Sequence, residues 1–221
     1  QLFLWSCANP KADFGFMLLT PDLHFADSSA KRLIRSLALT SPQLIIGYLS
    51  VTELSEYTMT ESEFAQTLQN QEGLQPDSQV FQQKMAEFKT RMSKYERDRL
   101  YPSLPDWPVA CFYPMGKLRI PGQNWFSLPF EKRKEFMRGH GNVGRKYSGR
   151  VLQLITGSTG LDDMEWAVTL FAKSTTDIKA IVYEMRFDPA SALYADFGEF
   201  FIGLSLSPHQ LLARLGLDCS S

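Results

Sequence analysis

Short apolar runs separated by turn residues open the chain. Residues 1–8 and 14–19 are apolar, and the segment 9–12 between them, Asn-Pro-Lys-Ala, has the composition of a turn. Two apolar runs joined in this way predict a β-hairpin. The run Asp27-Ser28-Ser29 then offers N-cap chemistry. It predicts the start of a helix whose apolar positions are Leu33, Ile34, Leu37 and Leu39.

The rest of the first half contains one more predicted strand. Residues 45–56 are rich in β-branched and aromatic side chains, which favours a strand. Residues 59–73 are polar and lack a strong period, so no element is predicted there. The first half is therefore expected to run β-β-α-β.

A long amphipathic helix is predicted over residues 77–99. Apolar side chains recur there at helical spacing on a charged background, at Val80, Phe81, Met85, Phe88, Met92 and Tyr95. Three prolines within residues 102–108 are expected to end it.

The second half alternates predicted strands and helices, as an α+β unit does. Its predicted elements are a strand at 109–115, a helix at 129–140, strands at 151–157 and 165–172, a helix at 175–187 and a strand at 197–206. The order β-α-β-β-α-β is that of the ferredoxin-like unit. The first half matches the last four elements of the same unit. We therefore expect two tandem ferredoxin-like repeats of antiparallel sheet with helices on one face, over residues 1–108 and 109–221. The first repeat lacks its first strand and helix, which suggests that the numbering begins inside a longer chain.

Composition excludes several classes of protein. Hydrophobic residues make up 44% of the 221 residues and charged residues 21%, which excludes a disordered chain. The formal net charge of −1 gives no general attraction for nucleic acid. The cysteines Cys7, Cys111 and Cys219 form no CxxC pair, so we expect free thiols and a cytoplasmic location. No apolar run approaches the roughly 20 residues of a membrane span, and no signal peptide is expected.

A band of positive charge lies between residues 131 and 150, with seven Lys or Arg residues and two Glu residues. It is either an anion-binding surface or a solvated helix face. His140 lies in this band, four residues after Phe136 and three after Met137, and therefore shares the apolar side of the predicted helix. Glycines flank it, and the helix is expected to break there. His140 is a candidate axial ligand of a haem iron, the alternative being a hydrogen-bonded core histidine. No Cys or His at zinc-ligand spacing accompanies it.

Two polar side chains lie among apolar neighbours on predicted strands. Period two places Tyr113 between Cys111 and Met115 on one face of its strand, and Gln153 among valine and isoleucine on one face of another. Each requires a partner if it is buried. Each is therefore either a satisfied core polar group or part of a site.

Four separate runs resemble the chlorite dismutase-like haem protein superfamily, in the same order along the chain. They are HGNVGRKYSG at 140–149, GSTGLDDMEW at 157–166, VYEMRFD at 182–188 and FGEFFIG at 197–203. Upstream, CFYPM at 111–115 and the pair Asn124-Trp125 resemble the coproheme decarboxylase branch. The similarity is strong from about residue 99 to 217 and weaker over 11–57.

This resemblance implies a dimeric α+β barrel of two fused ferredoxin-like repeats, a homopentamer, and coproheme bound in the C-terminal repeat. Carried over by position, His140 matches the iron ligand, Tyr113 the redox-active tyrosine and Gln153 the distal residue. Positions that match coproheme-binding or propionate-binding residues are Arg99, Met115, Lys117 and Ser191, and Lys117 also has a catalytic role. For Arg99 and Lys117 the alternatives are a helix-ending residue and a solvated lysine.

The activity implied is the hydrogen peroxide-dependent decarboxylation of two propionates of iron coproporphyrin III (coproheme) to give haem b, with a transient contact with ferrochelatase. Alternatives are a chlorite dismutase or haem peroxidase of the same fold, or a non-enzymatic haem-binding or sensing protein. True chlorite dismutases carry arginine at position 153, and the neutral amide of Gln153 cannot supply that fixed charge. Presence of both Tyr113 and Lys117 favours catalysis over binding alone.

The chain departs from the family pattern at two places. Met164 stands where the family has tryptophan, which removes one aromatic ring. Pro189 and Ala190 replace an acidic and an apolar residue before Ser191, which leaves the register of that loop open.

Overall fold

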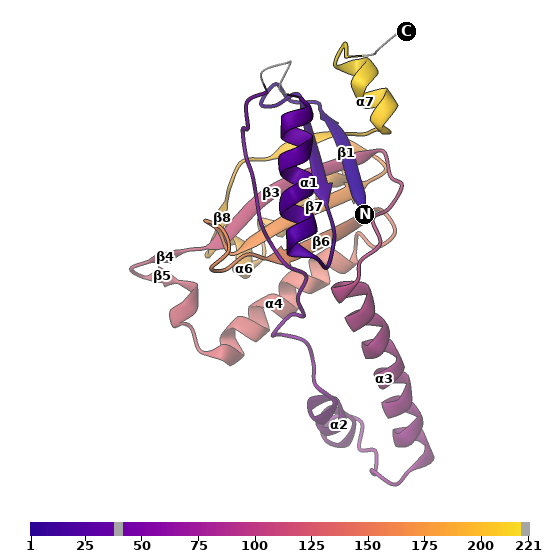
Figure 1. Ribbon diagram of the computed structural model, residues 1–221. Helices are drawn as coiled ribbons and strands as arrows, with labels where there is room; N and C mark the ends of the chain where they lie inside the picture. Colours follow the sequence, from indigo (N-terminus) through magenta and orange to yellow (C-terminus); the bar gives the residue numbers. More distant parts are fainter. Residues whose placement is uncertain (38–41, 218–221) are drawn as a thin grey trace. The chain divides into compact units, whose positions relative to one another are not determined.

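The computed structural model describes residues 1–37 and 42–217, so Leu39 and Cys219 lie outside the described residues. The chain forms two compact units (Figure 1). One combines Gln1–Ser50 with Leu104–Ser221, and the other is Val51–Ser103. The predicted repeat boundary between residues 108 and 109 stays a prediction.

The first unit is built on one antiparallel sheet in the order β2-β1-β9-β3-β7-β6, with β8 also paired to β3. Its strands are β1 Leu2–Cys7, β2 Phe14–Leu18, β3 Val109–Lys117, β6 Val151–Gly157, β7 Trp166–Ala172, β8 Ala195–Phe197 and β9 Phe201–Ser205. The series β3-α4-β6-β7-α5-β9 confirms the predicted ferredoxin-like order. The predicted N-terminal hairpin, β1 with β2, joins the same sheet because β1 pairs with β9.

Each face of the sheet carries its own core, because successive strand residues point to opposite sides. One face packs against α5 (Thr175–Met185), whose Ile178, Ile181 and Met185 are buried against Val168 and Leu170 of β7. The opposite face holds a second cluster of buried residues, namely Phe3, Trp5, Ala110, Leu154 and Phe171. Trp5 reaches across two glycines, since a Cβ at Gly15 or Gly203 would come within 3 Å of its ring.

The predicted strand at 197–206 is divided in two, and Pro114 explains the division. Proline cannot donate a ladder hydrogen bond. At Pro114 strand β3 changes partner from β9, paired through Phe112, to β8, which pairs from Met115 onward. Gly198 lies in the gap, where its N–H donates to the Pro114 carbonyl at 2.9 Å.

Helix α4 is longer than predicted, because it runs over Phe130–Arg145 and does not break after His140. Gly141 and Gly144 stay within it, although isolated glycines weaken helices. Packing of α4 against α5 and α6 (Pro189–Ala192) offsets this cost.

Two predictions for residues 1–56 were wrong. Helix α1 spans Leu23–Ser36 and so begins before the predicted cap at Asp27, because Asp22 provides the cap and accepts hydrogen bonds from the N–H groups of His24 and Phe25. The predicted strand at 45–56 forms no ladder in the described chain. Side-chain hydrogen bonds hold part of it instead, as in Ser50 Oγ to Thr156 Oγ1 at 2.7 Å, and Val51 forms only an isolated bridge.

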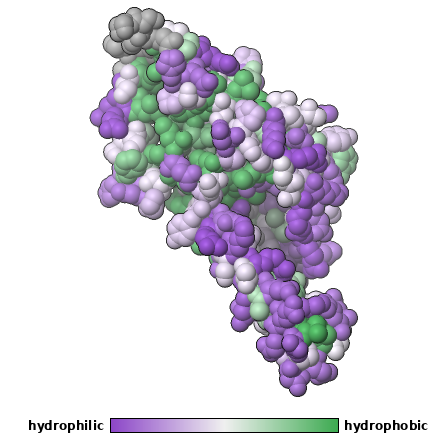
Figure 2. All heavy atoms as spheres, turned by 90° about the vertical axis from the view of Figure 1, so that its right-hand side faces the viewer, coloured by the Kyte–Doolittle hydropathy of each residue, from purple (hydrophilic) through white to green (hydrophobic). Residues whose placement is uncertain are grey.

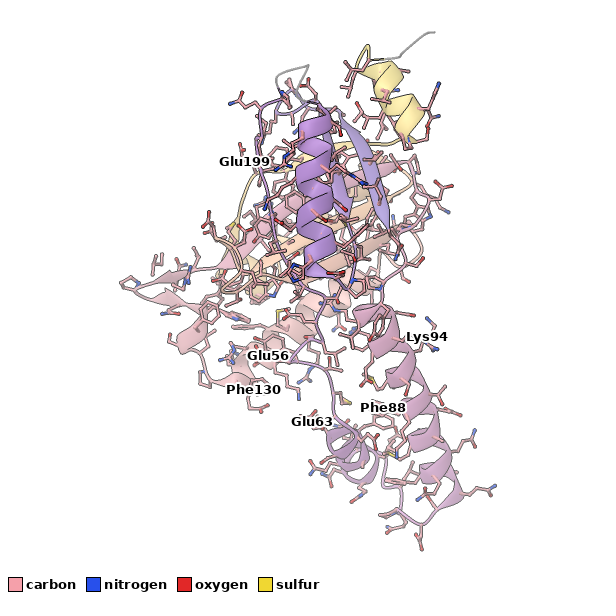
Figure 3. All side chains as sticks on the ribbon, in the orientation of Figure 1. Glu56, Glu63, Phe88, Lys94, Phe130 and Glu199 are labelled. Atoms are coloured by element: carbon pink, nitrogen blue, oxygen red, sulfur yellow. The ribbon has the colours of Figure 1, made fainter. Side chains whose placement is uncertain are left out.

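The second unit is a pair of helices, α2 (Glu61–Asn70) and α3 (Gln79–Leu100). The prediction for 77–99 is confirmed by α3, whereas α2 was missed although Thr60 and Glu63 form a capping box. Phe88 points from α3 toward α2 (Figure 3) and stacks on Phe64 with ring centroids 4.3 Å apart. The face of this unit seen in Figure 2 is mainly hydrophilic.

The remaining short elements are the strands β4 (Arg119–Ile120) and β5 (Gln123–Asn124), the 3-10 turn Trp125–Ser127 and α7 (Pro208–Arg214). Among the described residues, no helix combines the length and apolar composition needed to cross a lipid bilayer.

The close approach at Gly203 generates a stability prediction. A Cβ there would lie 2.0 Å from the carbonyl oxygen of Ser6, which belongs to the neighbouring backbone and cannot move away freely. Gly203→Ala should therefore lower the free energy of unfolding by about 1–3 kcal/mol, as overpacking does. Gly139→Ala is the matched control, since its Cβ meets nothing within 4 Å and should be neutral or stabilising by up to about 1 kcal/mol. Urea unfolding of both variants measures the difference, and equal midpoints would contradict the prediction.

Candidate functional site

Four of the predicted site residues lie on one face of the sheet. Tyr113 of β3 pairs with Val168 of β7, which in turn pairs with Ile155 of β6. Two residues further along β7, Leu170 pairs with Gln153 of β6. Directly paired residues share a face, and so do residues two apart. Tyr113, Lys117 and Gln153 therefore project from the same side, which we call the site face. Met115 lies on it too.

His140 is held by a carboxylate that sequence reasoning did not single out. His140 Nδ1 lies 3.0 Å from Asp188 Oδ2, and Asp188 in turn caps α6 by accepting hydrogen bonds from the N–H groups of Ala190 and Ser191 at 3.0 and 3.2 Å. Ser191 Oγ is 3.4 Å from the same imidazole nitrogen. Burial raises the pKa of Asp188, but the hydrogen bond and charge of His140 and the hydrogen bonds of Ser191 lower it more. The net pKa of Asp188 lies below its ordinary value, so the carboxylate is ionised.

The ionised partner fixes the state of the imidazole. With Nδ1–H donating to Asp188, Nε2 is the nitrogen whose lone pair is available to a metal when the ring carries a single proton. A carboxylate that accepts the second N–H of a histidine is the usual means of orienting a metal-ligating imidazole. The His140 side chain is 23% exposed, so solvent reaches part of the ring.

These donors suit a porphyrin iron better than a bare metal ion. The described residues contain no group of three or more His, Cys, Asp or Glu side chains that could hold a metal ion. A zinc ion requires three or four protein ligands. A haem iron can be held by a single histidine, because the porphyrin itself supplies four nitrogen ligands. His140 with Asp188 fits that requirement.

Lys117 is a buried ammonium at the end of β3, 7% exposed. Its Nζ donates to the carbonyl of Ala190 at 2.6 Å and lies 4.5 Å from the centroid of the Trp125 ring. Its backbone N–H donates to the buried carboxylate of Glu165 at 3.1 Å. Burial lowers the pKa of Lys117 to about 8, while the charge of Asp188 acts in the opposite direction. Residues 188–191 thus connect Lys117 with His140: Lys117 donates to the Ala190 carbonyl, while Asp188 and Ser191 contact the imidazole.

Tyr113 is a buried phenol among aromatic rings. It stacks on Phe200, with centroids 4.3 Å apart, and lies 5.9 Å from Phe197. Burial raises the pKa of Tyr113 far above its ordinary value, and the positive charge of Arg186 counteracts this only in part. The phenol therefore keeps its proton, and its oxidation must release that proton.

Gln153 lies against α4, one helical turn beyond His140. A Cβ added to Gly144 would come within 2.9 Å of Gln153 Nε2, so only glycine lets the amide lie this close to the helix. Gly144 follows His140 by four residues and shares its side of the helix. The amide and the imidazole are therefore brought to the same side of α4.

Arg99 is the one predicted site residue outside the first unit. It lies at the end of α3, where its Nε donates to the carbonyl of Glu53 at 3.2 Å. Its role toward propionates stays a prediction.

Sequence reasoning missed Asp188, although a signal for it exists. Asp followed by Pro is the pattern of an N-cap with proline at the first helical position, which is the role observed for Asp188 and Pro189. The helix is only four residues long, so hydrophobic periodicity could not reveal it.

Comparison with known proteins places these residues in a family. The chlorite dismutase family model matches residues 1–206. A protein of Natronomonas pharaonis provisionally named as heme-binding is 40% identical over 94% of this chain, and one of Halobacterium salinarum with the same provisional name is 39% identical over 95%. The chain spans only 32% and 39% of the lengths of these two relatives.

Solved structures agree with this relationship. A heme-binding protein from Thermus thermophilus superposes with a TM-score of 0.78 at 36% identity, covering 98% of this chain and 76% of that one. The chlorite dismutase from Candidatus Nitrospira defluvii, as its R173K mutant, shares the fold with a TM-score of 0.64 at 17% identity, covering 97% and 77% of the two chains. The family model covers nearly the whole chain, so this protein belongs to the chlorite dismutase family.

Proposed function

We propose that this chain binds iron coproporphyrin III and uses hydrogen peroxide to decarboxylate two of its propionates, giving haem b. The observation that carries the proposal is the linked set His140, Asp188, Ser191 and Lys117, which adjoins the site face that bears Tyr113 and Gln153. In this arrangement the Nε2 of His140 is available to an iron, and the buried phenol of Tyr113 is available for oxidation. The relatives named as heme-binding support the choice of a porphyrin ligand.

Each of these residues would have a distinct role in the reaction. A bound iron porphyrin with peroxide supplies the oxidising power, which belongs to the cofactor. His140 Nε2 would hold the iron, and Asp188 keeps the proton on Nδ1. Tyr113 would give up an electron and its hydroxyl proton. Lys117 and Ser191 would hold carboxylates through a charge-assisted and a hydroxyl hydrogen bond.

The chemistry balances when one proton is drawn from solvent for each peroxide consumed. Each propionate loses carbon dioxide, one proton and two electrons, and a vinyl group remains. Each peroxide takes up two electrons and two protons and gives two water molecules. Tyr113 would relay the electrons singly and would be restored at the end of each cycle.

Two other functions remain as alternatives, a chlorite dismutase or peroxidase and a haem-binding or sensing protein. The neutral Gln153 argues against the dismutase, since it cannot hold an anionic oxychlorine species by charge. A protein that only bound haem would not need the buried phenol of Tyr113. A homopentameric assembly and a transient contact with ferrochelatase remain part of the proposal.

His140 is the first residue to test. His140→Ala should weaken coproheme binding by more than about tenfold, since even a residue that only orients a metal ligand is worth that much, and should shift the Soret band. His209→Ala, which removes an exposed histidine of α7, is the control and should change neither. A His140→Ala protein with the parental Soret band would contradict the ligand assignment.

Tyr113→Phe separates catalysis from binding. The variant keeps the stacked ring and should bind coproheme within about tenfold of the parent, the value of one hydrogen bond. It should nevertheless release no carbon dioxide, because phenylalanine is not oxidised at a comparable potential. Tyr183→Phe, at an exposed tyrosine of α5, should react like the parent. Formation of haem b by Tyr113→Phe at the parental rate would refute the mechanism.

Position 153 tests the branch of the family. Gln153→Arg should raise oxygen release from chlorite by about tenfold or more, through one added charge-assisted hydrogen bond. Gln153→Met, which removes the polar group without adding charge, should not. An oxygen electrode measures both variants, and rapid, sustained oxygen evolution by the parent would overturn the branch assignment.

A further inference from the structure

Arg186 lies at the end of α5 and has no acidic partner within residues 1–37 and 42–217. It follows the last helical residue, Met185, and its guanidinium carbon lies 4.7 Å from the centroid of the Phe197 ring. No carboxylate among the described residues forms an ion pair with it. Stacking occupies the flat face of a guanidinium and leaves its N–H edge free.

The ring beneath Arg186 belongs to the site face. Phe197 of β8 pairs with Met115 of β3, so it projects from the same side of the sheet as Tyr113. The Tyr113 ring is 5.9 Å from it. The positive charge of Arg186 lowers the pKa of the Tyr113 phenol, against the larger effect of burial. The guanidinium therefore lies beside the residue proposed to be oxidised.

The two cations near the site face differ in exposure and in shape. Lys117 is buried, and one of its three N–H donors is used by the Ala190 carbonyl at 2.6 Å. Arg186 is exposed to solvent, and its donors are not used by a carboxylate of the described chain. A planar fork of N–H donors matches a carboxylate in geometry as well as in charge.

We propose that Arg186 binds one carboxylate of the porphyrin substrate at the rim of the site face, next to Tyr113. This assignment rests on the proposed function. It makes Arg186 a substrate-binding residue that orients one propionate-bearing edge of the porphyrin. A positive charge at a helix C-terminus also stabilises the helix dipole. That role alone would affect stability and leave porphyrin binding unchanged.

Arg186→Met tests the assignment, because methionine keeps an apolar stem over Phe197 and removes the charge. Arg150→Met is the matched control. Arg150 also stacks on an aromatic ring, Tyr147, at 4.7 Å, but it is paired with Asp177 at 3.1 Å. The measurement is the Kd for iron coproporphyrin III, from Soret titration, at low and high salt. The tetramethyl ester of the same porphyrin, solubilised in mild detergent, provides a ligand without carboxylate charge.

Arg186→Met should bind the free acid about tenfold more weakly than the parent, the loss of one charge-assisted hydrogen bond at a partly exposed site. The ratio should shrink as salt is raised, and the ester should bind both proteins equally. Arg150→Met should stay within about twofold of the parent. Arg186→Gln, with comparable volume and no charge, should behave as Arg186→Met does.

Equal affinity of the parent and Arg186→Met for the free acid would overturn the assignment. An equal loss for the acid and the ester would also overturn it, since packing rather than charge would then be responsible. A parent protein that binds neither porphyrin would instead contradict the proposed function, and with it the inference that rests on it.

Discussion

The candidate site depends on one buried carboxylate, that of Asp188. It accepts the imidazole N–H of His140 and the backbone N–H groups of Ala190 and Ser191. An ionised carboxylate inside a protein is stable only when such donors surround it. By accepting these hydrogen bonds, Asp188 fixes the tautomer of His140 and caps the start of α6. It thereby places the Ala190 carbonyl where Lys117 donates to it. Helix α4, strand β3 and the loop after α5 are therefore tied together at one residue.

The sheet supplies the second constraint, because its register decides which side chains face α4 and α5. A slip by one residue in β3 would turn Tyr113 and Lys117 to the opposite core. Pro114 lies in the middle of this strand and makes β3 exchange β9 for β8. The exchange brings Phe197 beside Tyr113, and the guanidinium of Arg186 lies over the Phe197 ring. The interruption of the ladder at Pro114 thus places an aromatic ring beside Tyr113 on the site face.

Sequence reasoning succeeded where the period was strong and local. Strand β6 was predicted to the residue, and alternation along the strand predicted at 109–115 placed Tyr113 and Met115 on one face, while the observed strand extends to Lys117 and adds it to that face. It failed where tertiary contacts decide. Segment 45–56 has strand composition but is held by side-chain hydrogen bonds, and α4 continues through glycines because neighbouring helices support it. The capping role of Asp188 could have been inferred from the Asp-Pro pair, but its contact with His140 could not, since nothing in a sequence shows that residues 140 and 188 meet.

The measurement that tests the central claim most directly is a peroxide titration of the parent chain loaded with iron coproporphyrin III, with the porphyrin product identified by mass spectrometry. A coproheme decarboxylase should convert the substrate stepwise through a singly decarboxylated product to haem b, with one peroxide consumed for each carbon dioxide released. A chain that binds the porphyrin and consumes peroxide, yet leaves all four propionates intact, would contradict the claim.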